Sequence, residues 1–331
     1  MASQASTGGT RELQFWVADA FTPAAFAGNQ AAVYCLADEA VITDAQRQRI
    51  AAEHNLSETA YVTLPPGADA GGGLDAFKTG DTFGLRWFTP AAEVPLCGHA
   101  TLASAHVLFS EVGNTSEALY FDTLSGRLTV RRAAGADGGV RIEMGLPWAD
   151  ARDPLPAGLG DAAAAGGGDA DARQQALGSL VATATGGLGT AEPVGFTKGM
   201  DYFLFVLPEG TTRAQLEAIR PDFGAMVAAV GEGAARGAIV TARGDGGDDY
   251  DFYCRFFGPW VSIDEDPATG SAFCVLGPYW APKLGKTQFK ARQCSPRGAD
   301  VAVRLDSEAR RVYVSGQGVT TMKGTLLLPP Q

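Results

Sequence analysis

One glutamate in this chain has a setting that suits proton transfer. Glu58 comes directly before an apolar segment, Ala60–Leu64, which the residue types predict to be a strand. At the rim of an apolar cleft, desolvation favours the protonated form of a carboxyl group, and such a group works well as a general acid or base. The alternative is a solvated glutamate at a strand end, or a cap.

A histidine and a cysteine stand together at the start of an apolar helix. His99 follows Gly98, and the positive end of the helix dipole there favours the neutral imidazole. Cys97 precedes the same helix, a position in which a thiol can become a low-pKa thiolate. The chain has 3 histidines, and they are too scattered along the sequence to suggest metal ligands, so we expect no metal site.

The segment that carries Cys97 and His99 has a counterpart later in the chain. Arg86-Trp87-Phe88-Thr89-Pro90 leads into Cys97-Gly98-His99, and Arg255-Phe256-Phe257-Gly258-Pro259 leads into Asp266-Pro267-Ala268-Thr269-Gly270-Ser271. Arg86 and Arg255 are 169 residues apart, and so are Cys97 and Asp266. The repetition predicts one structural unit used twice, with a site where the two copies face each other.

Small residues begin both predicted helices. Backbone N–H groups at Gly98 and at Thr269-Gly270-Ser271 would be free of partners within the helix and would lie at the positive end of its dipole. Such helix ends bind anions, so we expect the pair to hold a carboxylate substrate. The alternative is that small residues only allow close packing.

Each half of the chain combines short strands with one almost entirely apolar helix. These helices are predicted over Gly98–Phe109 and Thr269–Trp280, the second broken by Pro278 near its end. A helix without a polar face must be buried on all sides, and strands wrapped around it would achieve this. The pattern predicts an α+β fold with two similar domains, each a barrel-like sheet around a central helix, related by a pseudo-twofold axis.

The predicted domain boundary falls after residue 126. The first domain covers residues 1–126 and the second covers residues 127–331. Within the second, the glycine-, alanine- and aspartate-rich segment 158–172 is predicted to be a flexible insert, because it has little apolar surface to bury. A helix is predicted over Thr43–His54, with Thr43 as its N-cap.

Composition excludes several classes of partner. The 331 residues carry a net charge of −11, so no basic surface attracts nucleic acid or an anionic membrane. No nucleotide-binding motif is present, so we expect no bound nucleotide. The segment Met1–Gly9 lacks the features of a signal peptide, and 5 cysteines without a CxxC pair fit a reducing compartment, so we expect a cytoplasmic protein.

Several ordered motifs together resemble the PhzF-like family of phenazine-biosynthesis isomerases. They are Gly28-Asn29-Gln30-Ala31-Ala32-Val33, Ser57-Glu58-Thr59-Ala60, Arg86-Trp87-Phe88-Thr89-Pro90, Gly98-His99-Ala100-Thr101 and Asp266-Pro267-Ala268-Thr269-Gly270-Ser271-Ala272. The resemblance implies the diaminopimelate-epimerase-like fold, a site in the cleft between the domains, catalysis without a cofactor, and a homodimer.

The resemblance also implies roles for single residues. Glu58 would transfer a proton within a small carboxylate substrate, assisted by His99 and Asp266. Substrate binding would involve five further residues: Asn29, Ser57, Gly98, Gly270 and Ser271.

Two alternatives stay open at this point. One is an amino-acid epimerase that uses Cys97, although the second repeat has Asp266 where a partner thiol would stand. The other is a catalytically silent binding or scaffold protein on the same fold.

Overall fold

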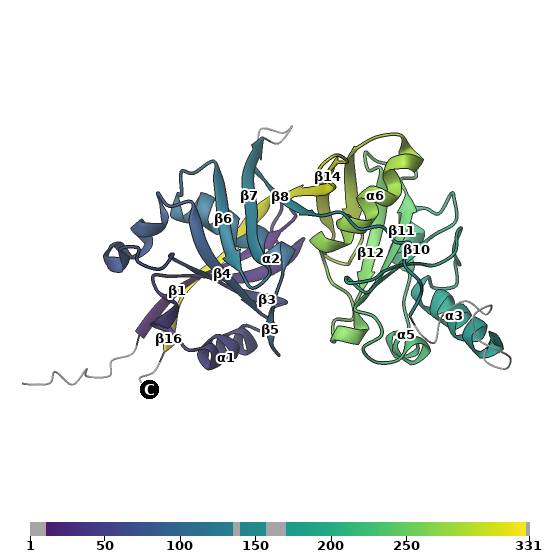
Figure 1. The fold of residues 1–331 in the computed structure, drawn as a ribbon, viewed down its shortest axis with the longest axis horizontal. Coiled ribbons are helices and arrows are strands. Elements are labelled where there is room, and N and C mark those ends of the chain that lie inside the picture. The colour runs from purple at the N-terminus through teal and green to yellow at the C-terminus, as the bar shows by residue number, and fades with distance from the viewer. Residues whose placement is uncertain (1–10, 135–139, 157–169, 329–331) are drawn as a thin grey trace, which may run out of the picture. The chain divides into compact units, whose positions relative to one another are not determined.

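The computed structural model describes residues 11–134, 140–156 and 170–328 (Figure 1). The chain divides into two compact units. Unit 1 comprises residues 1–26, 30–142 and 317–331, and unit 2 comprises residues 27–29 and 143–316. No helix within the described residues combines the length and the apolar character needed to cross a membrane.

Unit 1 consists mainly of a sheet whose strands pack around one buried helix. Its strands are β1 (Arg11–Ala20), β2 (Asn29–Leu36), β3 (Glu58–Thr63), β4 (Thr82–Phe88), β5 (Glu93–Val94), β6 (Ala118–Thr123), β7 (Gly126–Ala134) and β16 (Gly318–Leu328). They are hydrogen-bonded in the order β16-β1-β2-β3-β4-β6-β7, with β5 paired to β4. Its α-helices are α1 (Asp44–His54) and α2 (Gly98–His106), and a π-helical turn (Val107–Val112) follows α2.

Unit 2 repeats this plan with additional helices. Its strands follow the order β15-β14-β13-β12-β11-β10-β9. They are β9 (Gly195–Thr197), β10 (Tyr202–Val206), β11 (Gly237–Arg243), β12 (Phe252–Phe257), β13 (Gln288–Gln293), β14 (Ala299–Asp306) and β15 (Arg311–Gly316). Its α-helices are α3 (Ala170–Ala184), α4 (Arg213–Ala218), α5 (Phe223–Val230) and α6 (Phe273–Leu284). Strand β8 (Val140–Pro147) passes from one unit to the other along the chain.

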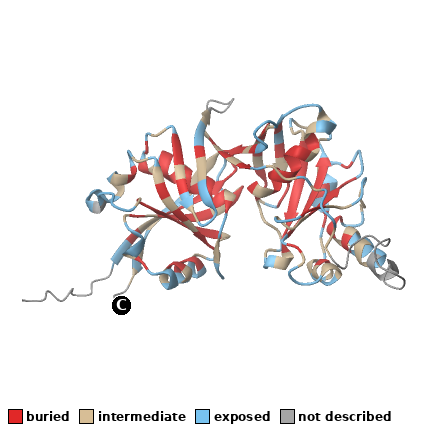
Figure 2. Cartoon of the chain, in the orientation of Figure 1, coloured by how far each residue is buried: buried red, intermediate tan, exposed pale blue. Residues whose placement is uncertain are grey.

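Burial of α2 and α6 confirms the predicted fold class. In α2 every residue from His99 to Ala105 is buried, and the helix packs against β1, β3 and β16 (Figure 2). In α6 Phe273–Pro278 and Trp280 are buried, and the helix packs against β14 and β15. Each unit thus has an apolar helix covered by strands, because neither helix has a polar face to present to water.

The internal repeat is visible in two further features. Helices α1 and α4 both begin with a capping box, formed by Thr43 with Gln46 and by Thr212 with Gln215. The two threonines are 169 residues apart, which is the spacing of the arginines. Each box satisfies amides at a helix start, and an N-cap of this type contributes about 1 kcal/mol. The predicted helix over Thr43–His54 and its cap are therefore confirmed.

Both repeat arginines form a two-pronged ion pair with a glutamate. Arg86 Nε and Nη2 donate to Glu93 at 2.7 and 2.8 Å. Arg255 donates to Glu265 in the same way, at 2.7 Å for both bonds. Each guanidinium also lies over the aromatic ring two residues on, Phe88 or Phe257. The repeated sequence segments therefore form equivalent local structures.

The division of the chain differs from the predicted boundary after residue 126. Strand β7 pairs with β6 in antiparallel register and therefore belongs to unit 1. Strand β16 returns to unit 1 and pairs with β1 from Arg11 opposite Leu328 to Ala20 opposite Gly318 (Figure 1). A boundary set by sequence position alone misses a pairing between the two ends of the chain.

Two local predictions also need correction. Residues 158–169 of the predicted insert lie outside the described residues, but 170–172 are the first turn of α3. Helix α6 begins at Phe273, after a 3₁₀ turn over Gly270–Ala272, and continues past Pro278 to Leu284. Proline has no N–H for the carbonyl four residues earlier. That carbonyl, of Cys274, instead accepts a hydrogen bond from the Ala149 amide at 3.0 Å.

Candidate functional site

Glu58 and His99 lie side by side in unit 1. Glu58 is the first residue of β3 and is buried, whereas the sequence placed it just before the strand. His99 is the second residue of α2, which packs against β3, and it is 4% exposed. The distance between Glu58 Oε2 and His99 Nε2 is 3.1 Å. A buried carboxylate thus faces an imidazole from a neighbouring element.

Cys97 extends this pair on the other side of the imidazole. Its Sγ lies 3.4 Å from His99 Nδ1, whereas Glu58 Oε2 approaches Nε2 of the same ring. Cys97 is the N-cap residue of α2, and its side chain forms no capping hydrogen bond. Cys97, His99 and Glu58 therefore form one compact group of side chains.

The electrostatics of this group correct two expectations. Burial lowers the pKa of His99, but the acidic neighbours Cys97 and Glu58 outweigh it and raise that pKa well above the ordinary value. Burial, aided by Glu58, raises the pKa of the Cys97 thiol. The pKa of the thiol thus lies above its ordinary value, and both acidic neighbours favour an imidazolium at His99. The helix dipole, which favours a neutral imidazole and a thiolate, is the weaker influence here.

In unit 2 the Asp266 carboxylate is held by two side chains. Asn29 Nδ2 donates to Asp266 Oδ1 at 2.7 Å, and the Thr269 hydroxyl donates to Oδ2 at 2.5 Å. Gln293, at the end of β13, donates to the Asp266 carbonyl at 2.7 Å and accepts from the Thr269 amide at 2.8 Å. Asn29 and Gln293 are completely buried. The carboxylate consequently has a fixed orientation.

The loop before Asn29 is fastened by an arginine. Arg297 donates to the carbonyls of Gly28 and Ala27 at 2.8 and 3.0 Å. The Gly28 amide donates to the Gly298 carbonyl, and Gly28 has a φ of 62°, a region that favours glycine. This anchoring fixes Asn29 and, through it, Asp266.

Gly270 and Ser271 begin the 3₁₀ turn that leads into α6. The Ser271 hydroxyl lies 2.9 Å from the Tyr202 hydroxyl on β10, and burial raises the pKa of Tyr202. One amide of the expected anion site already has a partner, because Thr269 N–H donates to Gln293. The predicted anion site at this helix start therefore has fewer backbone amides available for a ligand than the sequence indicated.

The predicted residues fall into two groups. Glu58 and His99 lie together in unit 1, where Ser57 and Gly98 are their chain neighbours, and Asn29 and Asp266 lie together in unit 2. Sequence reasoning missed Gln293 and Tyr202. A buried amide at the end of a charged, alternating strand gives no signal of its own, because its role depends on a contact with Thr269, 24 residues away.

The structure also brings together possible metal ligands that the sequence did not suggest. One ligand atom from each of Glu58, Cys97 and His99 lies within 4.8 Å of the other two. The expectation of no metal-ligand cluster considered only spacing along the chain, whereas β3 and the start of α2 supply these donors from separate segments.

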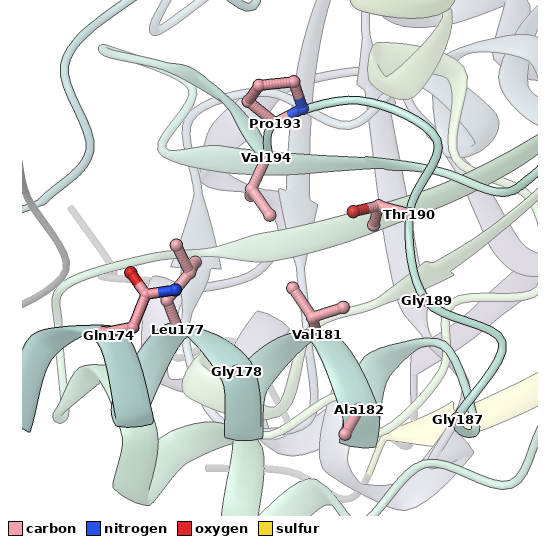
Figure 3. A pocket seen from close by; sticks show the side chains of 10 residues that line it. All are labelled: Gln174, Leu177, Gly178, Val181, Ala182, Gly187, Gly189, Thr190, Pro193 and Val194. Carbon is pink, nitrogen blue, oxygen red and sulfur yellow. The ribbon is translucent and has the colours of Figure 1, made fainter.

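A groove of about 310 Å³ beside α3 contains none of the candidate residues. It lies between α3 and the segment 187–194, and Leu177, Val181 and Val194 line it (Figure 3). Its lining contains no titratable side chain, so it offers no group for proton transfer.

Comparisons with known proteins agree with the sequence motifs. A family model described as phenazine biosynthesis-like protein matches residues 18–324. A phenazine biosynthesis-like domain-containing protein of Rattus norvegicus is 36% identical over 325 residues, which cover 95% of this chain and 99% of that protein. A Pseudomonas aeruginosa protein named as an uncharacterized isomerase is 38% identical over 317 residues, with 96% and 99% covered. The crystal structure of a PhzF-family phenazine biosynthesis protein from Enterococcus faecalis has a TM-score of 0.73 at 32% identity, with 96% of this chain and 100% of that chain covered.

Proposed function

The chain belongs to the phenazine biosynthesis-like family, and from this premise we propose that it is a cofactor-independent isomerase acting on a small carboxylate substrate. The observation that carries the proposal is the 3.1 Å contact between the buried carboxylate of Glu58 and His99. The name of the Pseudomonas aeruginosa relative, an isomerase, supports the same class of reaction.

The proposed step is a proton transfer within the substrate. Glu58 removes a proton from one carbon atom, and the electron pair left behind shifts through an adjacent double bond. Glu58 then returns a proton, which exchanges with solvent while the carboxyl group holds it, to a second carbon atom, so that substrate and product are isomers. A single carboxyl group that serves as base and then as acid needs no external oxidant or reductant.

His99 and Asp266 have assisting roles in this proposal. The imidazolium of His99 faces Glu58 and stabilises its carboxylate before the first proton transfer and after the second. Asp266 serves as a fixed acceptor that orients a donor group of the substrate, which fits its two hydrogen bonds from Asn29 and Thr269. The first-turn amides of Gly98, Gly270 and Ser271, with Asn29 and Ser57, are proposed to contact the substrate.

Exchange with deuterated water tests the proposal without knowledge of the natural substrate. We expect the wild-type protein to catalyse incorporation of deuterium at carbon into at least one member of a panel of cyclic and amino carboxylic acids, measured by NMR or mass spectrometry. Ligands that bind are first identified by thermal shift. If several acids bind and none exchanges, the protein is a binding or scaffold protein and the isomerase proposal is wrong.

An epimerase that uses Cys97 is the second candidate, and the contact between Cys97 and His99 favours it. Such an enzyme needs an acid/base group on each face of the substrate, and the second repeat offers Asp266 rather than a thiol. Cys274, the nearest cysteine in that repeat, is a buried residue of α6. These features favour Glu58 over Cys97 as the proton carrier.

Replacing Cys97 by serine separates the two candidates. We expect exchange activity to fall by much less than the roughly 10²-fold that removal of a general acid/base residue costs. Cys274→Ser serves as the matched control for loss of a buried thiol. A loss of several orders of magnitude in Cys97→Ser, with Cys274→Ser unaffected, would favour the epimerase.

A further inference from the structure

A cluster of three unlike donors in unit 1 fits a metal ion. Glu58 supplies a carboxylate oxygen, His99 an imidazole nitrogen and Cys97 a sulfur, and these atoms lie within 4.8 Å of one another. All three residues are buried, at 8, 4 and 7% exposure, and two of them are fixed at the start of a buried helix. Few rotatable bonds therefore separate the donors from a common centre.

The distances agree with the coordination geometry of zinc. A tetrahedral Zn²⁺ ion with bonds of about 2.0–2.1 Å to nitrogen and oxygen holds these two ligands about 3.3–3.4 Å apart. Glu58 Oε2 and His99 Nε2 are already 3.1 Å apart. A Zn–S bond of about 2.3 Å needs the sulfur about 3.5 Å from the other donors. The three ligand atoms lie within 4.8 Å of one another, so the side chains must approach by up to about 1.3 Å to reach these distances.

The donor types select the kind of ion. A thiolate and an imidazole favour zinc and the later divalent transition metals, whereas Mg²⁺ and Ca²⁺ favour oxygen ligands only. Three protein ligands leave the fourth position of a tetrahedral ion open to water or to a carboxylate of a bound molecule. The arrangement therefore has the ligand count of an open zinc site.

We propose that Glu58, Cys97 and His99 bind a zinc-like divalent ion, and that this ion inhibits the enzyme. Binding displaces the thiol proton and any imidazolium proton to solvent, because the ligands coordinate in their deprotonated forms. The inhibition rests on the proposed function: an ion coordinated by Glu58 withdraws the carboxylate that moves the proton. Metal binding itself does not depend on that function.

Cobalt supplies a direct spectroscopic test on the full-length protein. Metal-free wild-type protein is titrated with Co²⁺, whose bond to a thiolate gives a charge-transfer band in the near ultraviolet. We expect a band that saturates at about one equivalent and is displaced by Zn²⁺. It disappears in Cys97→Ser and in Cys97→Ala, and it persists in Cys35→Ser, which removes a thiol outside the cluster.

The other two ligands are tested by affinity. We expect His99→Gln and Glu58→Gln each to weaken Zn²⁺ binding by roughly 10-fold or more, since loss of even an outer-shell partner costs this much. His54→Gln is the control for loss of a histidine outside the cluster. Circular dichroism and melting curves establish that each variant is folded.

Two kinds of result would contradict parts of the inference. Absence of a stoichiometric band in wild type, or a band that survives removal of Cys97, would overturn the metal site whether or not the protein is an isomerase. Conversely, full deuterium exchange in the presence of saturating Zn²⁺ would overturn the inhibition and leave the site intact. Restoration of activity by a chelator is the outcome that supports inhibition.

Discussion

Replacing Glu58 by glutamine is expected to abolish most turnover while leaving ligand binding largely intact. Glutamine keeps the size and a hydrogen-bonding oxygen of the side chain but cannot carry the proton. The rate should therefore fall by about 10²-fold or more, the usual cost of losing a general acid/base group. The ligand dissociation constant should change little, because the backbone amides at Gly98 and Gly270 are untouched. Both quantities are measured on the substrate that shows exchange.

Glu53→Gln is a suitable control. Glu53 is an exposed residue of α1, and its substitution removes the same charge as Glu58→Gln. It should behave as wild type in both measurements. A Glu58→Gln variant that turns over at nearly the wild-type rate would remove Glu58 from the chemistry. Equal proportional losses of binding and rate would instead indicate a binding residue.

Removing Glu265 is expected to have one of the largest effects on stability of any single substitution in unit 2. Its partner Arg255 has a side chain only 5% exposed, and its remaining bonds go to the carbonyls of Leu216 and Ile219 at the end of α4. Glu265→Ala leaves a buried guanidinium without its counter-charge. The cost of breaking a buried pair in this way is about 3–5 kcal/mol in the free energy of unfolding, measured by urea denaturation.

The other repeat supplies the matched comparison. Glu93→Ala breaks the equivalent pair with Arg86, whose side chain is 20% exposed and also contacts Asp44 at 2.8 Å. Water and Asp44 can still interact with the Arg86 guanidinium after Glu93 is removed. The free energy of unfolding should therefore fall by only about 1 kcal/mol. Equal losses in the two variants would mean that burial of the arginine does not determine the contribution of the pair.

Much of the fold was predictable because the signals for it are local. The capping box of Thr43 and Gln46 involves residues three apart, and the helix it begins was correctly placed. Helices α2 and α6 were recognised because a helix without polar residues must be buried. The equivalence of Arg86 and Arg255 followed from their spacing, since the same residue pattern formed the same ion pair twice.

The remaining features depend on contacts between distant segments. The pKa of His99 is raised by the adjacent Cys97 and by Glu58, 41 residues earlier, against the effect of its own helix dipole. Gln293 matters because it bonds to Thr269 and Asp266 from a strand whose alternating charges gave no indication of a site. The roles of Glu58, His99 and Asp266 in catalysis remain predictions that the exchange and substitution experiments address.

The pairing of β16 with β1 has a consequence for biosynthesis. All of unit 2 lies before residue 317, so its strands and α6 can assemble as soon as that stretch has left the ribosome. Unit 1 has its first strand from the outset but receives the partner of that strand, Gly318–Leu328, only after all of unit 2. Until then one edge of β1 has unpaired amides and carbonyls that can associate with other nascent chains. Emergence of Gly318–Leu328, rather than of the first 142 residues, is therefore the event that completes the N-terminal part of this protein.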